Sequence, residues 1–307
     1  MQQLFRYVMF SFTSGYYKVE STFITLHFNK LDKSRFYEIV NYNFGGVYMK
    51  ILSVNVNNFG GTKDKPLLKD YKLPNGENDY KMWNQTVDEW RSNNKICIQK
   101  NVDAITNLAQ DFDIIFLHEV DTNCFSWTGL LEKMSPQYDW KPANGHDKSE
   151  YEKGRKSISC VFIKKGIAFE YEDNNILNKQ RNIEIKVGDT HIIGLHMSYD
   201  IDDWDSLISK FKALQTEKFL IIGDLNVFDK GTKRREKFDE LLNAGAIDIW
   251  LEQGDCNDVP TANTNKRIDY ALSTRKLYEK GAHEVILNFV RLGNFTDHAA
   301  IAVIYSD

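Results

Sequence analysis

The amino-acid sequence predicts a single α/β domain. Apolar runs of strand length alternate along the chain with segments whose apolar residues recur every three or four positions, the spacing of one helix face. No linker rich in proline, glycine or serine separates these elements. A chain of 307 residues, 42% of them apolar, can bury a full hydrophobic core.

The expected strands are short apolar runs that end in polar residues or glycines. The first spans residues 51–56 and is followed by Asn, Phe and two glycines, so it delivers polar side chains to a loop. Further strands are expected at residues 113–117, 159–163, 182–187, 191–195, 219–222, 268–272, 284–289 and 299–305.

Helical spacing occurs in residues 98–108, 204–214 and 234–243. Asp202 or Asp203 is available as the N-cap of the second helix, and Gly245 is placed to end the third. The segment from Gly60 to Glu89 begins with a polar stretch that contains two prolines, so it is expected to be an exposed loop.

Residues 1–48 differ in composition from the rest of the chain. They hold thirteen of the forty aromatic residues, and they show no clean strand or helix period. Gly45-Gly46 can be encoded by a ribosome-binding sequence just upstream of the Met49 codon, so we expect the native start at Met49 and one catalytic domain over residues 49–307. The alternative is an aromatic-rich extension that packs on the domain.

Charge and cysteine usage restrict the class of protein. The 43 acidic residues outnumber the 39 basic ones, which argues against a surface that binds nucleic-acid phosphates everywhere. No stretch approaches the about 20 consecutive apolar residues of a membrane helix. The four cysteines lie far apart in the sequence, so reduced thiols in a cytoplasmic protein are expected. The sequence also shows no sign of an obligate protein partner.

Polar residues suited to phosphate chemistry lie at the ends of the apolar runs or within a terminal strand. Their carboxylate and amide oxygens are hard ligands that suit Mg²⁺ or Mn²⁺, and no cysteine accompanies them to favour zinc. Each has an ordinary structural explanation when taken singly, so the combination and its order carry the argument. The set comprises Asn55, Glu119, His196, Asp224, Asn226, Asp269, Asp297 and His298.

Short blocks around these residues resemble the endonuclease/exonuclease/phosphatase superfamily, which includes pancreatic-type DNases, exonuclease III-type nucleases, inositol polyphosphate 5-phosphatases and neutral sphingomyelinases. The blocks follow the family order over residues 49–307, with His118 where glutamine is usual. They are Ser53-Val54-Asn55-Val56-Asn57, Phe116-Leu117-His118-Glu119-Val120, Gly194-Leu195-His196, Gly223-Asp224-Leu225-Asn226, Arg267-Ile268-Asp269-Tyr270 and Thr296-Asp297-His298.

The resemblance implies a four-layer α/β/β/α sandwich of two packed mixed β-sheets flanked by helices. It also implies that Glu119, with Asn55 and Asp297, holds a divalent cation against a phosphate oxygen. Asp224 would then orient or deprotonate the attacking water, and Asn226 would donate to the phosphoryl oxygens.

The resemblance further pairs Asp269 with His298, so that the imidazolium binds phosphate. His196 would bind phosphate or protonate the leaving oxygen. Arg267 is expected to contact substrate or to be an ordinary surface arginine. Trp83 or Tyr80 is expected to stack on a nucleobase or to pack against another substrate group. The alternative is a surface loop whose tryptophans anchor it to the sheet edge.

Departures from the family blocks narrow the substrate. His196 stands where exonuclease III-type enzymes usually have tyrosine, which disfavours action at abasic sites. Ile221-Ile222 and residues 263–267 replace the blocks typical of inositol 5-phosphatases. A metal-dependent nuclease acting on DNA is therefore favoured. A phosphatase or phospholipase C-like hydrolase of a small molecule or lipid head group, and a non-catalytic binding protein, remain as alternatives.

Overall fold

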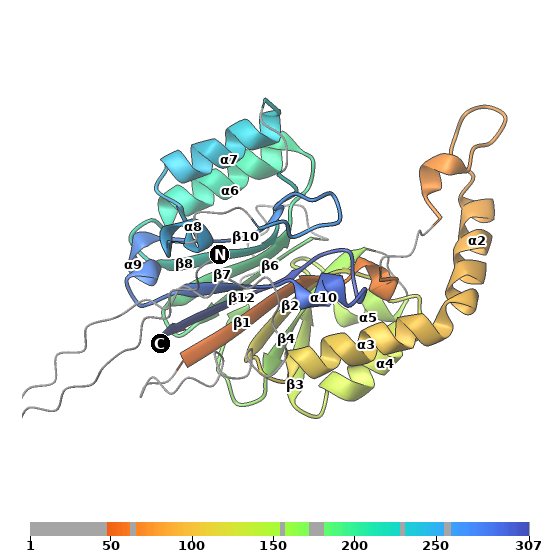
Figure 1. Cartoon of the computed structure of the whole chain (residues 1–307), viewed down its shortest axis with the longest axis horizontal. Helices are drawn as coiled ribbons and strands as arrows, with labels where there is room; N and C mark the ends of the chain where they lie inside the picture. The colour runs from red at the N-terminus through yellow and green to blue at the C-terminus, as the bar shows by residue number, and fades with distance from the viewer. Residues whose placement is uncertain are drawn as a thin grey trace, which may run out of the picture.

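The computed structural model describes residues 48–61, 66–153, 157–171, 181–227, 231–254 and 259–306. Two six-stranded sheets pack face to face, and helices cover both outer faces (Figure 1). Helices α3 (Lys95–Ala109) and α4 (Phe125–Met134) lie on one sheet. Helices α6 (Ile201–Ala213) and α7 (Lys233–Asn243) lie on the other. This arrangement confirms the four-layer α/β/β/α sandwich that the sequence predicted.

The first sheet has the strand order β11-β12-β1-β2-β4-β3. Strands β1 and β2 are parallel, and the other pairs are antiparallel. The bounds are Tyr48–Asn55 for β1, Ile114–Val120 for β2, Tyr138–Pro142 for β3, Ile158–Lys164 for β4, His283–Leu287 for β11 and Ala300–Ser306 for β12.

The second sheet has the strand order β5-β6-β7-β8-β10-β9. Strands β7 and β8 are parallel, and the other pairs are antiparallel. The bounds are Glu170–Tyr171 for β5, Asn182–Val187 for β6, Thr190–His196 for β7, Lys218–Asp224 for β8, Ile247–Asp248 for β9 and Asp269–Ser273 for β10.

Helices and single turns connect the strands. The helices are α2 (Tyr80–Asn93), α3 (Lys95–Ala109), α4 (Phe125–Met134), α5 (Lys148–Glu152), α6 (Ile201–Ala213), α7 (Lys233–Asn243), α8 (Ile249–Glu252), α9 (Arg275–Tyr278) and α10 (Phe289–Leu292). The 3-10 turns are η1 (Asn57–Phe59) and η2 (Leu68–Asp70). Among the described residues, no helix is both long and apolar enough to cross a membrane.

Three apolar cores follow from the four layers. One lies between α3, α4 and the first sheet, one between the two sheets, and one between the second sheet and α6 and α7. Strands buried on both faces need apolar residues at nearly every position, which is why the sequence shows continuous apolar runs instead of alternation. Strand β8, for example, is buried throughout.

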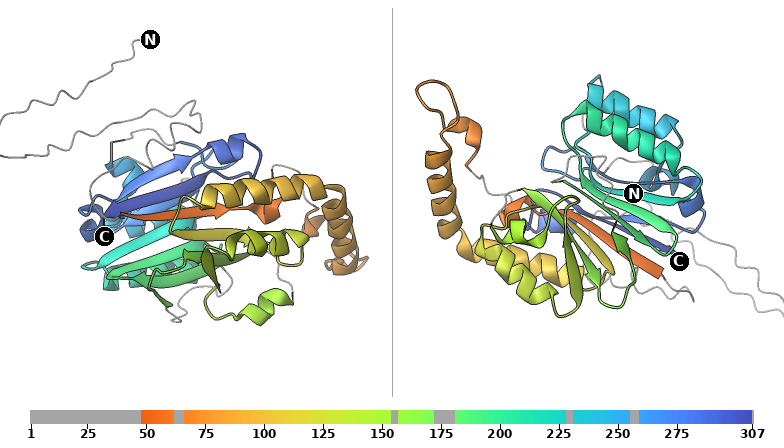
Figure 2. Two further views of the ribbon diagram at one scale, coloured as in Figure 1. Left: turned by 90° about the horizontal axis from the view of Figure 1, so that it is seen from below. Right: turned by 180° about the vertical axis from the view of Figure 1, so that it is seen from behind.

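The structure corrects the expectation of a loop from Gly60 to Glu89. Residues 80–93 form α2, whose N-cap Asp79 accepts a hydrogen bond from the backbone nitrogen of Met82 at 2.9 Å. Figures 1 and 2 show α2 projecting from the body of the protein beyond the end of α3.

Two smaller differences concern helix ends and missed elements. The N-cap of α6 is Asp200, not Asp202 or Asp203. Helix α4 and strand β3 were not expected. The expectation for the first 48 residues lies outside the described residues apart from Tyr48, which pairs with Ser306 at the start of β1.

Candidate active site

The predicted catalytic and metal-binding residues meet at one edge of the sandwich. Asn55, His196 and Asp224 end strands β1, β7 and β8, which carry them to the same edge from both sheets. The side-chain nitrogen of Asn55 donates to Asp224 Oδ2 at 3.1 Å, so one hydrogen bond joins the two sheets at this point. Asp269 begins β10, opposite Asp224 in the antiparallel register.

Glu119 lies where strand β2 loses its regular pairing. The register with β4 shifts between Leu117 and Val120, and Glu119 has a φ of 55°. A left-handed conformation is costly for a residue with a Cβ, so the surrounding structure must impose it. The bulge re-aims the carboxylate, and Glu119 Oε1 lies 3.6 Å from His196 Nε2.

His118 is fully buried beneath the site. Its Nδ1 lies 2.8 Å from the hydroxyl of Ser159 on β4, and its Nε2 lies 3.2 Å from the hydroxyl of Ser53 on β1. Burial holds the pKa of His118 well below its usual value, and His196 and His298 lower it further. The neutral ring therefore cross-links three strands directly beside Glu119.

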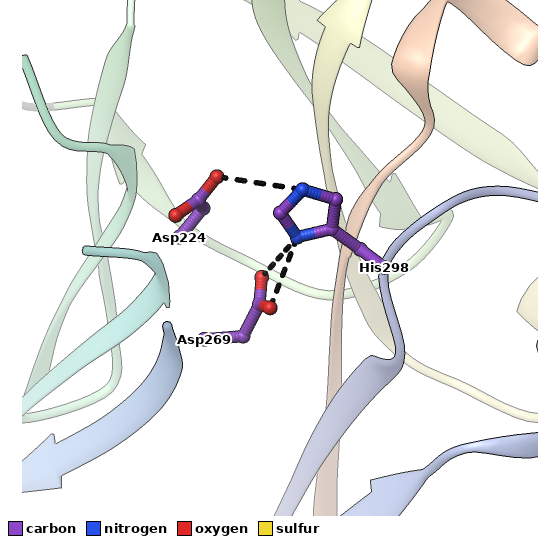
Figure 3. Close-up of side chains that lie close together, drawn as sticks. All are labelled: Asp224, Asp269 and His298. Atoms are coloured by element: carbon purple, nitrogen blue, oxygen red, sulfur yellow. Dashed lines mark hydrogen bonds and ion pairs between the residues drawn. The ribbon is translucent and has the colours of Figure 1, made fainter. Parts of the chain in front are cut away.

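Figure 3 shows the imidazole of His298 between two carboxylates. Its Nδ1 lies 3.0 Å from Asp269 Oδ2, and its Nε2 lies 3.9 Å from Asp224 Oδ2. Burial lowers the pKa of His298, but Asp269 and then Asp224 raise it more strongly, to about 10. His298 is therefore an imidazolium at neutral pH.

His196 differs from His298 in its protonation state. Burial lowers the pKa of His196 to about 4, although Asp224 opposes this shift. Its Nδ1 is buried without a hydrogen-bond partner in the described part of the chain. His196 is thus a neutral imidazole at neutral pH.

The loop after β8 places Asn226 beside Asp224. Asp224 Oδ1 accepts from the backbone nitrogen of Asn226 at 2.9 Å, and Asn226 takes a φ of 54°. The Asn226 side chain donates to the carbonyl of Met197 at 3.2 Å. Burial raises the pKa of Asp224, His298 lowers it and Asp269 raises it, so this carboxylate has a greater affinity for a proton than an exposed aspartate.

Asp297 is a further candidate oxygen ligand. Burial raises its pKa, His298 lowers it, and the negative charge of Glu119 raises it further. The hydroxyl of Thr296 donates to the carbonyl of Asn55 at 2.6 Å, which ties the Asp297 segment to the end of β1. Two carboxylates and the amide oxygen of Asn55 fit a hard divalent cation, which would offset the repulsion between Glu119 and Asp297.

A second possible metal cluster consists of Asp224, Asp269 and His298, which offer ligand atoms within 4.8 Å of one another. An imidazolium has no lone pair to donate to a metal ion. In the absence of a cation Asp269 and Asp224 favour the protonated form of His298, so the three residues form an ion-paired network; with His298 deprotonated, the same atoms are a ligand set for a cation.

Arg267 requires a correction. Its side chain is only 1% exposed, and its guanidinium donates to both carboxylate oxygens of Asp248, at 2.8 and 2.7 Å. Glu284 lies 3.5 Å away on the same guanidinium. Arg267 therefore forms a buried ion pair with Asp248 at the end of β9. It is neither a substrate contact nor a surface arginine.

Trp83 lies on α2 and not on a loop. Its indole nitrogen donates to the carbonyl of Pro66 at 2.9 Å, so the side chain fastens the preceding loop to the helix. This contact joins the preceding loop to α2, whereas the alternative expected from the sequence was anchoring to the sheet edge. Stacking of Trp83 on a nucleobase stays a prediction.

Several residues that organise the site were not expected from the sequence. Thr261 Oγ1 accepts from the backbone nitrogens of Ile268 and Asp269 at 2.9 and 3.0 Å and so fixes the start of β10. Tyr199 and Arg234 flank Asn226. For Tyr199, the one indication in the sequence is its position three residues after His196.

Comparison with known proteins gives the fold. A 3'-5' exonuclease (NExo) from Neisseria meningitidis matches with a TM-score of 0.54 at 15% identity, over 84% of this chain and 100% of that one. Humanized TDP2 of D. rerio matches with a TM-score of 0.49 at 13% identity, over 85% and 99%. The exonuclease match confirms the endonuclease/exonuclease/phosphatase-type fold. No family model and no curated protein matches the sequence.

Proposed function

We propose that this protein is a divalent-metal-dependent phosphodiester hydrolase, a nuclease that acts on DNA. One observation carries the proposal: strand ends from both sheets bring Glu119, Asp224, His196 and the Asp269–His298 pair into one cluster. The cluster combines an acidic metal-ligand set, a carboxylate with raised proton affinity and a buried imidazolium. The protein shares its fold with a 3'-5' exonuclease.

The metal would be Mg²⁺ or Mn²⁺, held by Glu119, Asn55 and Asp297. When bound, such an ion neutralises charge on the phosphate and on the leaving oxygen. Asp297 and Thr296 are fixed to the end of β1, and the bulge in β2 aims Glu119 toward His196. These contacts support the proposal that the fold would hold the cation ligands in place before substrate arrives.

Asp224 is suited to accept the proton of the attacking water, because burial raises its pKa above that of an exposed aspartate. Its Oδ2 is already fixed by the amide of Asn55. The side-chain amide of Asn226 donates one hydrogen to the carbonyl of Met197. It can donate its second hydrogen to a phosphoryl oxygen that gains charge during the reaction.

The two histidines supply different interactions. His298, positively charged, attracts a phosphate oxygen and is held in orientation by Asp269. His196, neutral, can donate an N–H hydrogen bond to a phosphate oxygen from Nε2, which lies 3.6 Å from Glu119 Oε1 and 3.7 Å from Asp224 Oδ2. Because its pKa is lowered to about 4, we assign His196 to binding the phosphate rather than to carrying a permanent positive charge.

Hydrolysis of a substrate panel tests the proposal. Plasmid DNA, RNA, inositol phosphates and sphingomyelin are incubated with the protein and Mg²⁺, then with EDTA. We expect hydrolysis of DNA that EDTA abolishes and that Asp224→Asn reduces by orders of magnitude. Equal activity in EDTA would refute the metal requirement, and unchanged activity of Asp224→Asn would remove this cluster from the reaction.

A phosphatase or phospholipase C-like activity is the second candidate. The formal net charge of −4 favours it, because a small substrate needs no extended basic surface. Hydrolysis of an inositol phosphate or sphingomyelin without hydrolysis of DNA or RNA would select this alternative.

A further inference from the structure

Tyr199 presents an exposed aromatic ring beside the candidate active site. It lies between β7 and α6 and is 62% exposed. Its hydroxyl lies 3.5 Å from the side-chain oxygen of Asn226. A large ring left in water at this position is available to a ligand that occupies the site.

Arg234 covers one face of the Tyr199 ring. The guanidinium carbon lies 4.2 Å from the ring centroid, within the range of a cation–π contact. The same guanidinium donates to the backbone carbonyl of Asn226 at 2.9 Å. Arg234 is the second residue of α7, so a helix, the loop after β8 and the ring are fastened together.

The segment that carries Tyr199 is also fixed. The backbone nitrogen of Met197 donates to the carbonyl of Asp224 at 2.7 Å. Ser198 bonds to Asp203, and Asp200 caps α6 by accepting from the backbone nitrogen of Asp202 at 3.1 Å. The ring therefore belongs to a preformed surface, and ordering it costs little conformational entropy when a ligand binds.

We propose that Tyr199 stacks on an unpaired nucleobase next to the scissile phosphate, with Arg234 supporting the opposite face of the ring. The inference rests on the proposed nuclease function and names its substrate class as single-stranded or frayed polynucleotide. A base inside a duplex is already stacked on its neighbours, so only an unpaired base offers a face to Tyr199.

The charge on Arg234 argues for a neutral base over a cationic head group. A quaternary ammonium would bind an aromatic face through the same attraction that Arg234 already uses. With the guanidinium on the opposite face, a second cation would meet a repelling charge across the ring. A nucleobase has no net charge and gains from stacking on the exposed face of the ring.

The test compares Tyr199→Ala, Tyr199→Phe and the original protein on two single-stranded substrates. One is an oligodeoxythymidylate, and the other is a backbone of the same length that carries no bases. Tyr199→Ala should raise KM for the oligodeoxythymidylate about 5- to 150-fold, the range expected for loss of one base–aromatic stack. It should leave KM for the baseless polymer within about twofold, and Tyr199→Phe should retain the low KM because it keeps the ring.

Tyr80→Ala tests the rival tyrosine that the sequence also offered for stacking, which is 58% exposed and lies on α2. Its KM for both substrates should stay within about twofold of the original. A rise with Tyr80→Ala and none with Tyr199→Ala would move the stacking ring to α2 and overturn the proposal. Equal losses by Tyr199→Ala on both substrates would show that it only positions Asn226, which also overturns it.

A binding measurement separates this inference from the proposed function. Fluorescence anisotropy of a labelled oligodeoxythymidylate is followed with Asp224→Asn and with Asp224→Asn/Tyr199→Ala. Weaker binding by the double variant supports stacking, and equal binding refutes it even if the protein proves to be a nuclease. If the original protein neither binds nor hydrolyses any polynucleotide, the proposed function fails together with this inference.

Discussion

Gly194 on β7 lies directly against the ring of Phe116 on β2, in the opposite sheet. A methyl group added to Gly194 would come 2.0 Å from Cδ1 of Phe116. The two sheets therefore approach closely only because residue 194 has no side chain. This contact lies two residues before His196 and three before Glu119, so it helps to set the 3.6 Å separation between these two side chains.

Gly194→Ala should destabilise the protein by about 1–3 kcal/mol or more, because Phe116 is fully buried and cannot move aside. Urea denaturation measures the loss. The matched control is Gly129→Ala within α4, where an added methyl group would meet only ordinary contacts at 3.6 Å. There a change of about 0.5–1 kcal/mol in the stabilising direction is expected. Equal stability of both variants would contradict the close approach of the sheets.

The long buried strands and the positions of the residues that end them were predictable from the sequence because they depend on local pattern. Buried strands require uninterrupted apolar residues, and the polar residue that ends each run lies at the sheet edge. For this reason Asn55, His196 and Asp224 could be placed before the structure was known. Strand bounds differed from expectation by a few residues.

Features that depend on distant partners were not predictable. Arg267 stands in a block next to Asp269, and nothing in its neighbourhood indicates that Asp248 and Glu284 bury it. His118 likewise depends on two serines from separate strands. Helix α2 carried a local signal, with Asp79 as its N-cap, but prolines and glycines earlier in the segment favoured a loop.

Asp269 and His298 should act as a unit. Asp269→Asn, His298→Ala and the double variant should lose activity to similar extents, because either change removes the oriented imidazolium. NMR titration in EDTA should also show the pKa of His298 in Asp269→Asn well below about 10, since burial then faces less opposition. Multiplicative losses of activity would show that the two side chains work independently.

Glu284 should make stability fall as pH rises. Burial raises the pKa of Glu284 from 4.5 to about 8, although Arg267 opposes this shift. The folded protein then keeps a proton that the unfolded chain releases, so this contribution is complete below pH 4.5 and is lost as pH approaches 8. Oε1 of Glu284 is buried and has no hydrogen-bond partner among the described residues, so it is the candidate protonation position.

Glu284→Gln should abolish this dependence, because glutamine does not titrate. Between pH 5 and 8, the free energy of unfolding of the original protein should fall relative to the variant by up to about 1.4 kcal/mol per pH unit. Glu252→Gln, which alters an exposed pair with Arg275, should leave the pH dependence as it is. Parallel curves for the original and Glu284→Gln would mean that Glu284 is ionised in the folded state.

Glu119→Gln should weaken metal binding more than the fold, because it removes one ligand charge at nearly constant volume. We expect a higher Mg²⁺ concentration for half-maximal activity and an unchanged Tm. Calorimetric titration with Mn²⁺ measures the binding directly. Glu132→Gln on the exposed face of α4 is the control and should behave like the original. Full activity of Glu119→Gln at low Mg²⁺ would remove Glu119 from the ligand set.

Trp83 should stabilise α2 locally. Trp83→Phe removes the hydrogen bond to Pro66 and should speed amide hydrogen exchange in α2, while exchange in β1 and β8 stays slow. Val87 and Arg91 in the second half of α2 are buried, and Arg91 pairs with Asp121. Loss of order confined to the exposed first half of α2 should therefore not lower the stability of the sheets. Trp83→Ala should increase exchange further.

Kinetics then separate anchoring from substrate contact. If Trp83 only anchors the loop, Trp83→Ala should change KM for a polynucleotide by less than about twofold and leave hydrolysis of methyl p-nitrophenyl phosphate unchanged. A rise in KM of several-fold that is confined to the polynucleotide would instead show that the indole stacks on a base, a contact typically worth about 1–3 kcal/mol. In that case α2 would form part of the substrate-binding surface. Because α2 projects beyond α3, the site would then contact a longer stretch of the polynucleotide.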